Sequence, residues 1–145
     1  MLERVLISND ELIPGENDYA KLSRALLEQQ KVTWEQLAKG YSSLETVQTK
    51  IFEFDDFTIK VQYNPGRIIS SSAKVDSESI KKRKCFLCYS NLPEMQRGLL
   101  YKSKFMVLCN PFPIFTEHFT LPHIDHIQQE IYSSFQKLLS FSKDL

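Results

Sequence analysis

Apolar residues recur at helical spacing in two stretches near the start of the chain. The first predicts a helix over residues 18–30, capped by Asn17 or Asp18. The second predicts a helix that begins at Thr33, where the side chain caps the backbone and Gln36 returns the bond. The apolar positions that define the two helices are Tyr19, Leu22, Ala25, Leu26, Trp34, Leu37, Ala38 and Tyr41.

The pattern changes to alternation in the middle of the chain. Residues 47–54 and 57–63 alternate their side chains on either side of two aspartates, which predicts an antiparallel hairpin. Asn64-Pro65-Gly66 is a turn signal at the end of the second strand. Residues 70–79 are polar enough to predict a loop.

The remaining strands and one further helix complete the expected fold. Residues 99–109 predict another hairpin-like unit with a buried strand at 105–109, and the next strand ends at Leu121, before a proline. Residues 128–142 predict an amphipathic helix packed on the sheet. Its apolar positions are Ile131, Phe135, Leu138 and Leu139. Helices at both ends with strands between them predict an α+β fold with an antiparallel sheet and flanking helices.

The chain is long enough for one modest domain. Its 145 residues are 42% hydrophobic and 12% aromatic, which is typical of globular proteins. We expect a helical segment over residues 1–45, in which residues 40–43 end the second helix. The α+β domain then covers residues 46–145.

Charge and apolar run length exclude several classes of partner. Eighteen basic and eighteen acidic side chains cancel, so no global field attracts nucleic acid or an anionic membrane. No signal segment and no run of about 20 apolar residues is present, so we expect a cytosolic chain that does not span a membrane.

The three cysteines are Cys85, Cys88 and Cys109, an odd count that favours reduced thiols or metal binding over disulfides. The Cys-x-x-Cys pair places two thiols about one turn apart, where both sulfurs reach one tetrahedral ion. His126 or His123 is the best further ligand. The residues alone leave a metal site and two free buried thiols equally open, whereas Cys109 lies in an apolar strand and is expected in the core.

Other polar residues have two readings each. His118 at a strand start is either a structural histidine or a ligand or phosphate contact. Gln62 and Asn64 at the hairpin exit offer amide hydrogen bonds to a base or sugar, and Arg67 offers a guanidinium to a phosphate. Exposed polar residues after a strand are also commonplace. The basic run at residues 81–84 either meets phosphates or is solvated surface.

Three motifs taken in order resemble one known superfamily. They are Val61-Gln62-Tyr63-Asn64-Pro65-Gly66-Arg67, then Arg83-Lys84-Cys85-Phe86-Leu87-Cys88, then the run from Asn110 to His126. The order resembles the histidine-triad (HIT-like) superfamily, in the branch of galactose-1-phosphate uridylyltransferases, dinucleoside tetraphosphate phosphorylases and GDP-sugar phosphorylases. The similarity covers about residues 51–135 and leaves the N-terminal helices outside.

The resemblance implies roles for several residues. In that branch a Cys-x-x-Cys pair and a histidine at the strand-to-helix turn bind zinc. Cys85, Cys88 and His126 match these three positions. The fourth ligand of that branch lies at a position beyond Leu145. In the family, the residue at the end of a strand meets the nucleotide ribose and a proline-rich turn follows it. Asn110 matches that residue, and His118 matches a position in the next strand. The interval from His118 to Pro122 is about one residue shorter than in the small triad proteins.

The resemblance also shows what this chain lacks. The family attacks the α-phosphorus with the central histidine of His-x-His-x-His or His-x-His-x-Gln, on a strand after the last helix. This chain stops in that helix and contains neither motif. We therefore assign no catalytic residue and infer a truncated gene product, a fragment or one half of a split protein.

Three hypotheses follow from these observations. The first is the nucleotide-binding part of a nucleotidyltransferase or phosphorylase acting on nucleoside diphosphate sugars or dinucleoside polyphosphates, with a C-terminal half supplying the triad. The second is a non-catalytic nucleotide- or zinc-binding module that dimerises through an open sheet edge. The third is a structural α+β domain whose cysteines are core.

Overall fold

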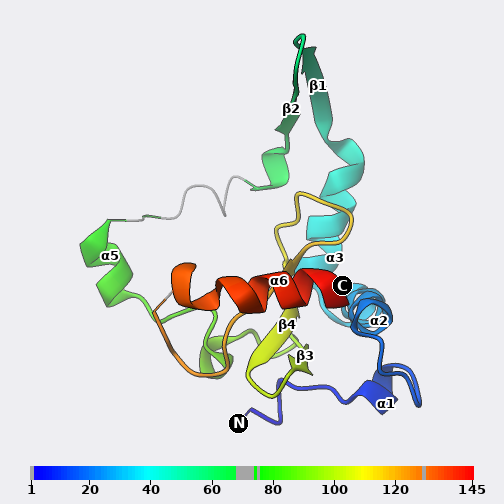
Figure 1. Ribbon diagram of the computed structural model, residues 1–145, viewed down its shortest axis with the longest axis vertical. Coiled ribbons are helices and arrows are strands. Elements are labelled where there is room, and N and C mark those ends of the chain that lie inside the picture. Colours follow the sequence, from blue (N-terminus) through cyan, green and yellow to red (C-terminus); the bar gives the residue numbers. More distant parts are fainter. Residues whose placement is uncertain (1, 68–73, 75, 129) are drawn as a thin grey trace.

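The computed structural model describes residues 2–67, 74, 76–128 and 130–145 and has an α+β architecture (Figure 1). The helices are α1 (Asn9–Leu12), α2 (Tyr19–Thr33), α3 (Glu35–Ser42), α5 (Ser77–Lys82) and α6 (Phe135–Asp144). Short 3-10 turns occupy η1 (Ser43–Thr46), η2 (Pro65–Arg67), η3 (Tyr89–Asn91) and η4 (Tyr132–Ser134). The strands are β1 (Gln48–Glu53), β2 (Thr58–Tyr63), β3 (Gly98–Tyr101), β4 (Phe105–Cys109) and β5 (Phe119–Thr120).

The strands form two separate antiparallel sheets. β1 and β2 pair as a hairpin with Phe52 opposite Ile59, and β3, β4 and β5 form a three-stranded sheet in that order. The predicted α+β class with antiparallel pairing is therefore confirmed. The strand before Leu121 is short, because β5 meets β4 over only Phe119 and Thr120.

The core lies between the N-terminal helices and the three-stranded sheet. α2 and α3 contribute buried leucines, and Trp34 between them packs in the same core. The strands β3 and β4 contribute Leu99, Tyr101, Val107 and Cys109. Burial of this apolar surface holds the helices on the sheet. Residues before 45 thus share one core with later strands, and a domain boundary at residue 45 stays a prediction.

The ends of the first two helices differ in part from expectation. Asp18 caps α2 as predicted, accepting hydrogen bonds from the backbone N–H groups of Ala20 and Lys21. The predicted cap at Thr33 is wrong, because Thr33 completes the last turn of α2 and its hydroxyl donates to the carbonyl of Gln29. Trp34 takes the N-cap position of α3 without a side-chain cap, and its burial in the core fixes the turn.

α3 ends at Ser42, within the expected stop at residues 40–43, and Gly40 lies inside its last turn. A Cβ atom at this position would overlap the backbone carbonyl oxygen of Pro111 and lie 3.1 Å from Cδ of Pro113. The glycine therefore allows α3 to pack directly on the proline-rich turn after β4. This contact places the turn beside the helix.

The last helix packs with the face opposite to the predicted one. The predicted helix 128–142 begins later, because η4 precedes α6. The hydroxyl of Tyr101 donates to Asp144 at 2.7 Å, and the ring of Tyr101 contacts that of Phe141. Lys102 donates to Ser140 and pairs with Asp144 at 2.8 Å. These polar and aromatic contacts turn the predicted packing face toward solvent.

Two further expectations bear on the chain outside the core. Residues 77–79 of the predicted loop belong to α5, whereas residues 70–73 and 75 lie outside the described residues. The part of the chain that the structure describes contains no helix long and apolar enough to cross a membrane.

Candidate metal centre and anion site

Cys85, Cys88 and His126 form a cluster with the dimensions of a metal site. The Sγ of Cys88 lies 3.1 Å from Nδ1 of His126, and the ligand atoms of all three residues lie within 4.8 Å of one another. Ligands arranged tetrahedrally around zinc are about 3.5–3.8 Å apart, as Zn–S and Zn–N bond lengths require. The donor set and its spacing therefore fit a thiophilic metal ion.

Backbone hydrogen bonds shape the cysteine loop. The N–H of Cys88 donates to the carbonyl of Cys85, and the side-chain amide of Asn91 donates to the same oxygen at 2.8 Å. The loop is thereby closed into a turn before η3. This closure brings both sulfurs to one side.

Pairing with β4 decides which histidine joins the cysteines. The N–H of Met106 donates to Pro122, and the N–H of Ile124 donates to Lys104, so the segment after β5 is fixed along β4. His123 is held against the ring of Phe105, and its Nδ1 accepts from the N–H of Asp125. His126 lies beyond this fixed segment and reaches the thiols.

The three thiols differ in acidity. Partial burial opposes ionisation of Cys85, but hydrogen bonds from Leu87 and Cys88, together with the charge of Arg83, lower its pKa below the ordinary value. Burial and the neighbouring Cys85 raise the pKa of Cys88. Burial raises the pKa of Cys109 to about 12. The pair thus favours one thiolate, whereas Cys109 is an inert core thiol as predicted.

The metal cluster provides three protein ligands within the described residues. A structural zinc site has four ligands in tetrahedral geometry. The fourth position is the coordination site that the described residues leave open.

A second group of predicted residues meets at the turn between β4 and β5. Nε2 of Gln62 donates to the carbonyl of Ile114 at 3.4 Å, and the N–H of Ile114 donates to Nδ1 of His118 at 3.3 Å. Oδ1 of Asn110 accepts from the N–H of Phe112 at 2.9 Å and holds the start of the turn. The hairpin exit and the turn therefore form one wall.

Tyr41 holds His118 in place, and sequence reasoning missed this residue. Its hydroxyl accepts from the N–H of His118 at 3.1 Å and lies 3.3 Å from the carbonyl of the same residue. Burial, as the largest cause, raises the pKa of Tyr41 to about 12, so the hydroxyl keeps its proton. Helical spacing marked Tyr41 as apolar core and gave no signal of this bond.

The hydrogen bond from Ile114 fixes the proton of the His118 ring. Nδ1 accepts, so a neutral ring carries its proton on Nε2. Nδ2 of Asn110 is also a donor and lies 3.5 Å from that Nε2. Nδ2 of Asn110 also donates to Oγ1 of Thr120 at 3.5 Å, so the N–H of Nε2 is the donor that faces another donor instead of an acceptor. Burial, and then the positive charge of Arg67, lower the pKa of His118 below its usual value, which keeps the ring neutral.

Two more donors beside this turn have no acceptor. Within the described part of the chain, Nδ2 of Asn64 and Nε of Arg67 are buried and make no hydrogen bond. The carbonyl of Asn64 accepts from the N–H of Arg67, and its Oδ1 accepts from that of Gly66, so η2 orients both side chains. We call Asn64, Arg67, Asn110 and His118 the donor cluster. A cluster of unsatisfied donors favours an acceptor ligand such as an anion.

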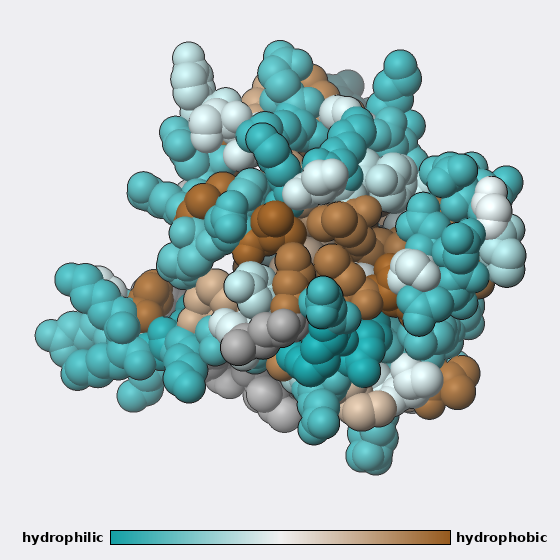
Figure 2. All heavy atoms as spheres, turned by 90° about the horizontal axis from the view of Figure 1, so that it is seen from below, coloured by the Kyte–Doolittle hydropathy of each residue, from teal (hydrophilic) through white to brown (hydrophobic). Residues whose placement is uncertain are grey.

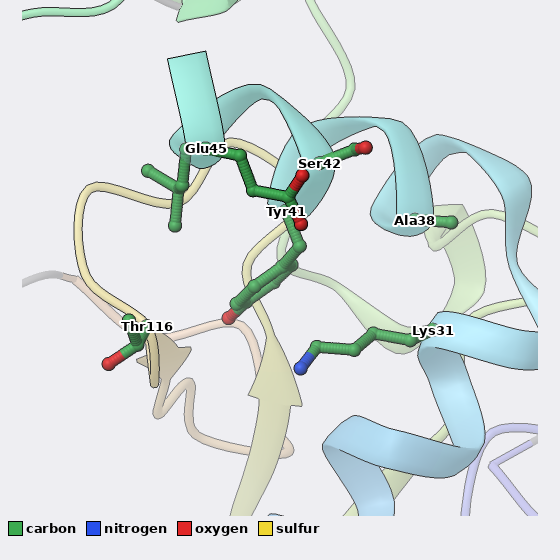
Figure 3. A pocket seen from close by; sticks show the side chains of 7 residues that line it. Lys31, Ala38, Tyr41, Ser42, Glu45 and Thr116 are labelled. Atoms are coloured by element: carbon green, nitrogen blue, oxygen red, sulfur yellow. The ribbon is translucent and has the colours of Figure 1, made fainter. Parts of the chain in front are cut away.

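Two hollows flank the β4–β5 turn, which carries Asn110 and His118 of the donor cluster. One, of about 550 Å³, is open beside Tyr41, which points into the space between Lys31 and Thr116 (Figure 3). The other, of about 440 Å³, lies between α3 and the turn, with Gly66 and Phe112 in its wall. The turn therefore has free space on two sides.

Fold and site together define an α+β protein with a Cys-Cys-His cluster and a separate donor-rich wall. The sequence model of the family described as Domain of unknown function (DUF4922) matches residues 26–145, and the chain belongs to this family. The match begins within α2 and so includes more of the N-terminal helices than the resemblance noted from the motifs. No curated protein and no solved structure matches the chain.

Proposed function

We propose that the chain binds a phosphorylated nucleoside at the donor cluster and a zinc ion at Cys85, Cys88 and His126. The observation that carries the nucleotide proposal is the excess of donors around His118. Among the described residues, Nδ2 of Asn64 and Nε of Arg67 are buried without an acceptor, and Nε2 of His118 faces a second donor. A phosphate supplies several strong acceptor oxygens. Gln62 completes the wall through its bond to Ile114 and is available to a base or sugar.

The resemblance to the uridylyltransferase and phosphorylase branch supports the wider proposal. The chain then provides base, ribose, phosphate and metal contacts of a nucleotidyltransferase or phosphorylase acting on nucleoside diphosphate sugars or dinucleoside polyphosphates. It supplies no nucleophile, because His-x-His-x-His/Gln is absent from it. A non-catalytic nucleotide- or zinc-binding module is the second candidate, since the donor cluster and the Cys-Cys-His cluster can each bind a ligand without turnover. The cytosolic location and the absence of nucleic-acid partners stay predictions.

Titration calorimetry with inorganic phosphate and the four nucleoside monophosphates tests the nucleotide proposal. We expect a nucleoside monophosphate to bind more tightly than phosphate, and Arg67→Ala to weaken binding about 10–100-fold, the range of a lost charged hydrogen bond. Arg83→Ala removes the same charge from an exposed position and should leave binding unchanged. Absence of binding to the wild-type chain, or equal losses in both variants, overturns the proposal.

The pKa of His118 provides an independent check. Burial and the charge of Arg67 lower the pKa of His118, so the folded chain favours the neutral ring. The stability that this group contributes to the fold is therefore lost as the pH falls below the ordinary histidine pKa. NMR titration of the ring should give a lower pKa for His118 than for a histidine in a peptide. Arg67→Ala should raise the pKa, and so should an anion bound beside the ring. An unchanged value in both experiments contradicts the placement of Arg67 beside His118.

Turnover separates the two candidate functions. The chain alone should not cleave UDP-glucose, GDP-mannose or diadenosine tetraphosphate in phosphate buffer, as followed by phosphorus NMR. A protein that carries the His-x-His motif is then added to the chain. Cleavage in the mixture would favour the first candidate, the nucleotide-binding part of an enzyme. Binding without turnover under all such conditions would favour the module.

A further inference from the structure

The β1–β2 hairpin exposes a face on which six apolar side chains gather. The observed register places one set of side chains on each side of the hairpin. The first face carries six apolar residues that are 39–61% exposed, namely Phe52, Phe54, Phe57, Ile59, Val61 and Tyr63. Gln48 and Lys50 share this face at its base, opposite Tyr63 and Val61. The second face carries polar residues and Ile51.

Figure 1 shows the hairpin standing apart from the body of the molecule, at one end of its long axis. β1 and β2 contact each other far more than they contact any other element. At its tip the rings of Phe54 and Phe57 stack on each other. A two-stranded hairpin is at best marginally stable in water, so a face of six apolar side chains needs a covering surface.

A second apolar face of the same molecule is also turned to solvent. α6 packs on the body through Ser140, Phe141 and Asp144. The opposite side of this helix and the turn before it carries four large apolar residues, each 48–73% exposed. They are Ile131, Phe135, Leu138 and Leu139. At the other end of the molecule from the hairpin, polar side chains surround a central group of apolar ones (Figure 2).

We propose that the apolar hairpin face of one copy of this chain packs on the exposed apolar face of α6 of a second copy, and reciprocally, in a two-fold dimer. A sheet face covered by an amphipathic helix is a common layer arrangement of folded proteins. A two-fold dimer pairs each hairpin with a helix, so both exposed faces are buried in both copies. The proposal goes beyond nucleotide and zinc binding and does not depend on them.

The area of the two faces is sufficient for a stable dimer. Aromatic side chains bury about 150–250 Å² each, so the half-exposed hairpin face offers roughly 500 Å² and the α6 face roughly 300 Å². Their sum is close to the roughly 800 Å² per partner of a standard protein interface. Neither face alone reaches this area.

Charge favours the same pairing. The hairpin tip carries Glu53, Asp55 and Asp56 and no basic residue from 53 to 58. α6 carries the exposed Lys143, and the one acid of this helix, Asp144, is paired with Lys102. Lys137 lies over the ring of Phe105, on the side of the helix that packs on the body. An acidic tip therefore meets a helix whose acid is already paired and which carries Lys143, and the net charge of zero gives no overall repulsion between copies.

Sedimentation velocity over a range of concentrations tests the dimer. We expect the wild-type chain to dimerise, and the double variant Phe52→Ser/Ile59→Ser to raise the dimer dissociation constant about 100-fold or more, as loss of central apolar contacts does. Leu138→Ser/Leu139→Ser should act similarly. Ile51→Ser is the matched control, because it removes an exposed apolar side chain from the other hairpin face, and it should leave dimerisation unchanged. Circular dichroism reports whether each variant folds.

Photo-crosslinking identifies the partner face without relying on stability. p-Benzoylphenylalanine in place of Phe57, in a mixture with isotope-labelled wild-type chain, should form crosslinks to residues 131–143 of the labelled copy. Crosslinks between two hairpins would overturn the helix as the partner. A wild-type chain that stays monomeric up to about 100 µM, well above the range of a standard interface, would overturn the dimer. Either failure leaves phosphate binding and zinc binding intact and separately measurable.

Discussion

The purified chain should contain about one zinc ion, and Cys88→Ser should remove it. The three ligand atoms lie within 4.8 Å of one another, and loss of one thiolate leaves two protein ligands. The free energy of unfolding should fall by about 3–4 kcal/mol, the linkage expected when free zinc exceeds its dissociation constant several hundredfold. Metal analysis by mass spectrometry and chemical unfolding with and without a chelator measure both effects.

His123→Gln is the matched control for the zinc prediction. His123 lies three positions before His126, but it packs on Phe105 and takes no part in the cluster. This variant should keep its zinc, whereas His126→Gln should lose it. Zinc content that is the same in Cys88→Ser and the wild-type chain, or absent from both after folding with zinc, contradicts the metal centre.

Gly40→Ala should destabilise the chain by about 3 kcal/mol, the upper range of overpacking. In an ordinary helix this change stabilises, because alanine has less backbone freedom to lose on folding. Here the added Cβ would overlap the carbonyl of Pro111, so the sign reverses. Urea unfolding measures the change, and phosphate affinity should fall as well, because the displaced turn carries Asn110 and His118.

Lys39→Ala is the control for Gly40→Ala. Lys39 is the preceding residue of α3 and forms an exposed ion pair with Glu35, so its loss should cost less than about 0.5 kcal/mol. A Gly40→Ala chain as stable as the wild type would show that α3 does not pack directly on the proline-rich turn.

The two halves of the metal site were predictable to different degrees. The Cys-x-x-Cys motif alone predicted the approach of its two thiols, because side chains three positions apart in a turn meet by local backbone geometry. His126 and His123 were equally good partners in sequence. Only the pairing of residues 122–124 with β4 decided between them, because it fixes His123 against Phe105.

The donor cluster shows the same division. Its members were recognisable as polar residues at strand ends and through the order of motifs. The bonds that give them a common orientation are long-range, such as the one between Tyr41 and His118. A tyrosine at helical spacing has the same pattern whether its hydroxyl is free or holds a histidine 77 positions away.

The sequence by itself determined α2, α3 and α6, the hairpin, the α+β class and the cysteine pair, because these follow from periods of two and 3.6 residues and from short spacings. The short helices α1 and α5 were not predicted. Tertiary structure alone decided which apolar faces became core. The apolar side of α6 faces solvent because Tyr101 and Lys102 hold its other side, and one face of the hairpin stays exposed although its alternation is regular. A pattern identifies an apolar face, but only packing against distant segments determines what covers it.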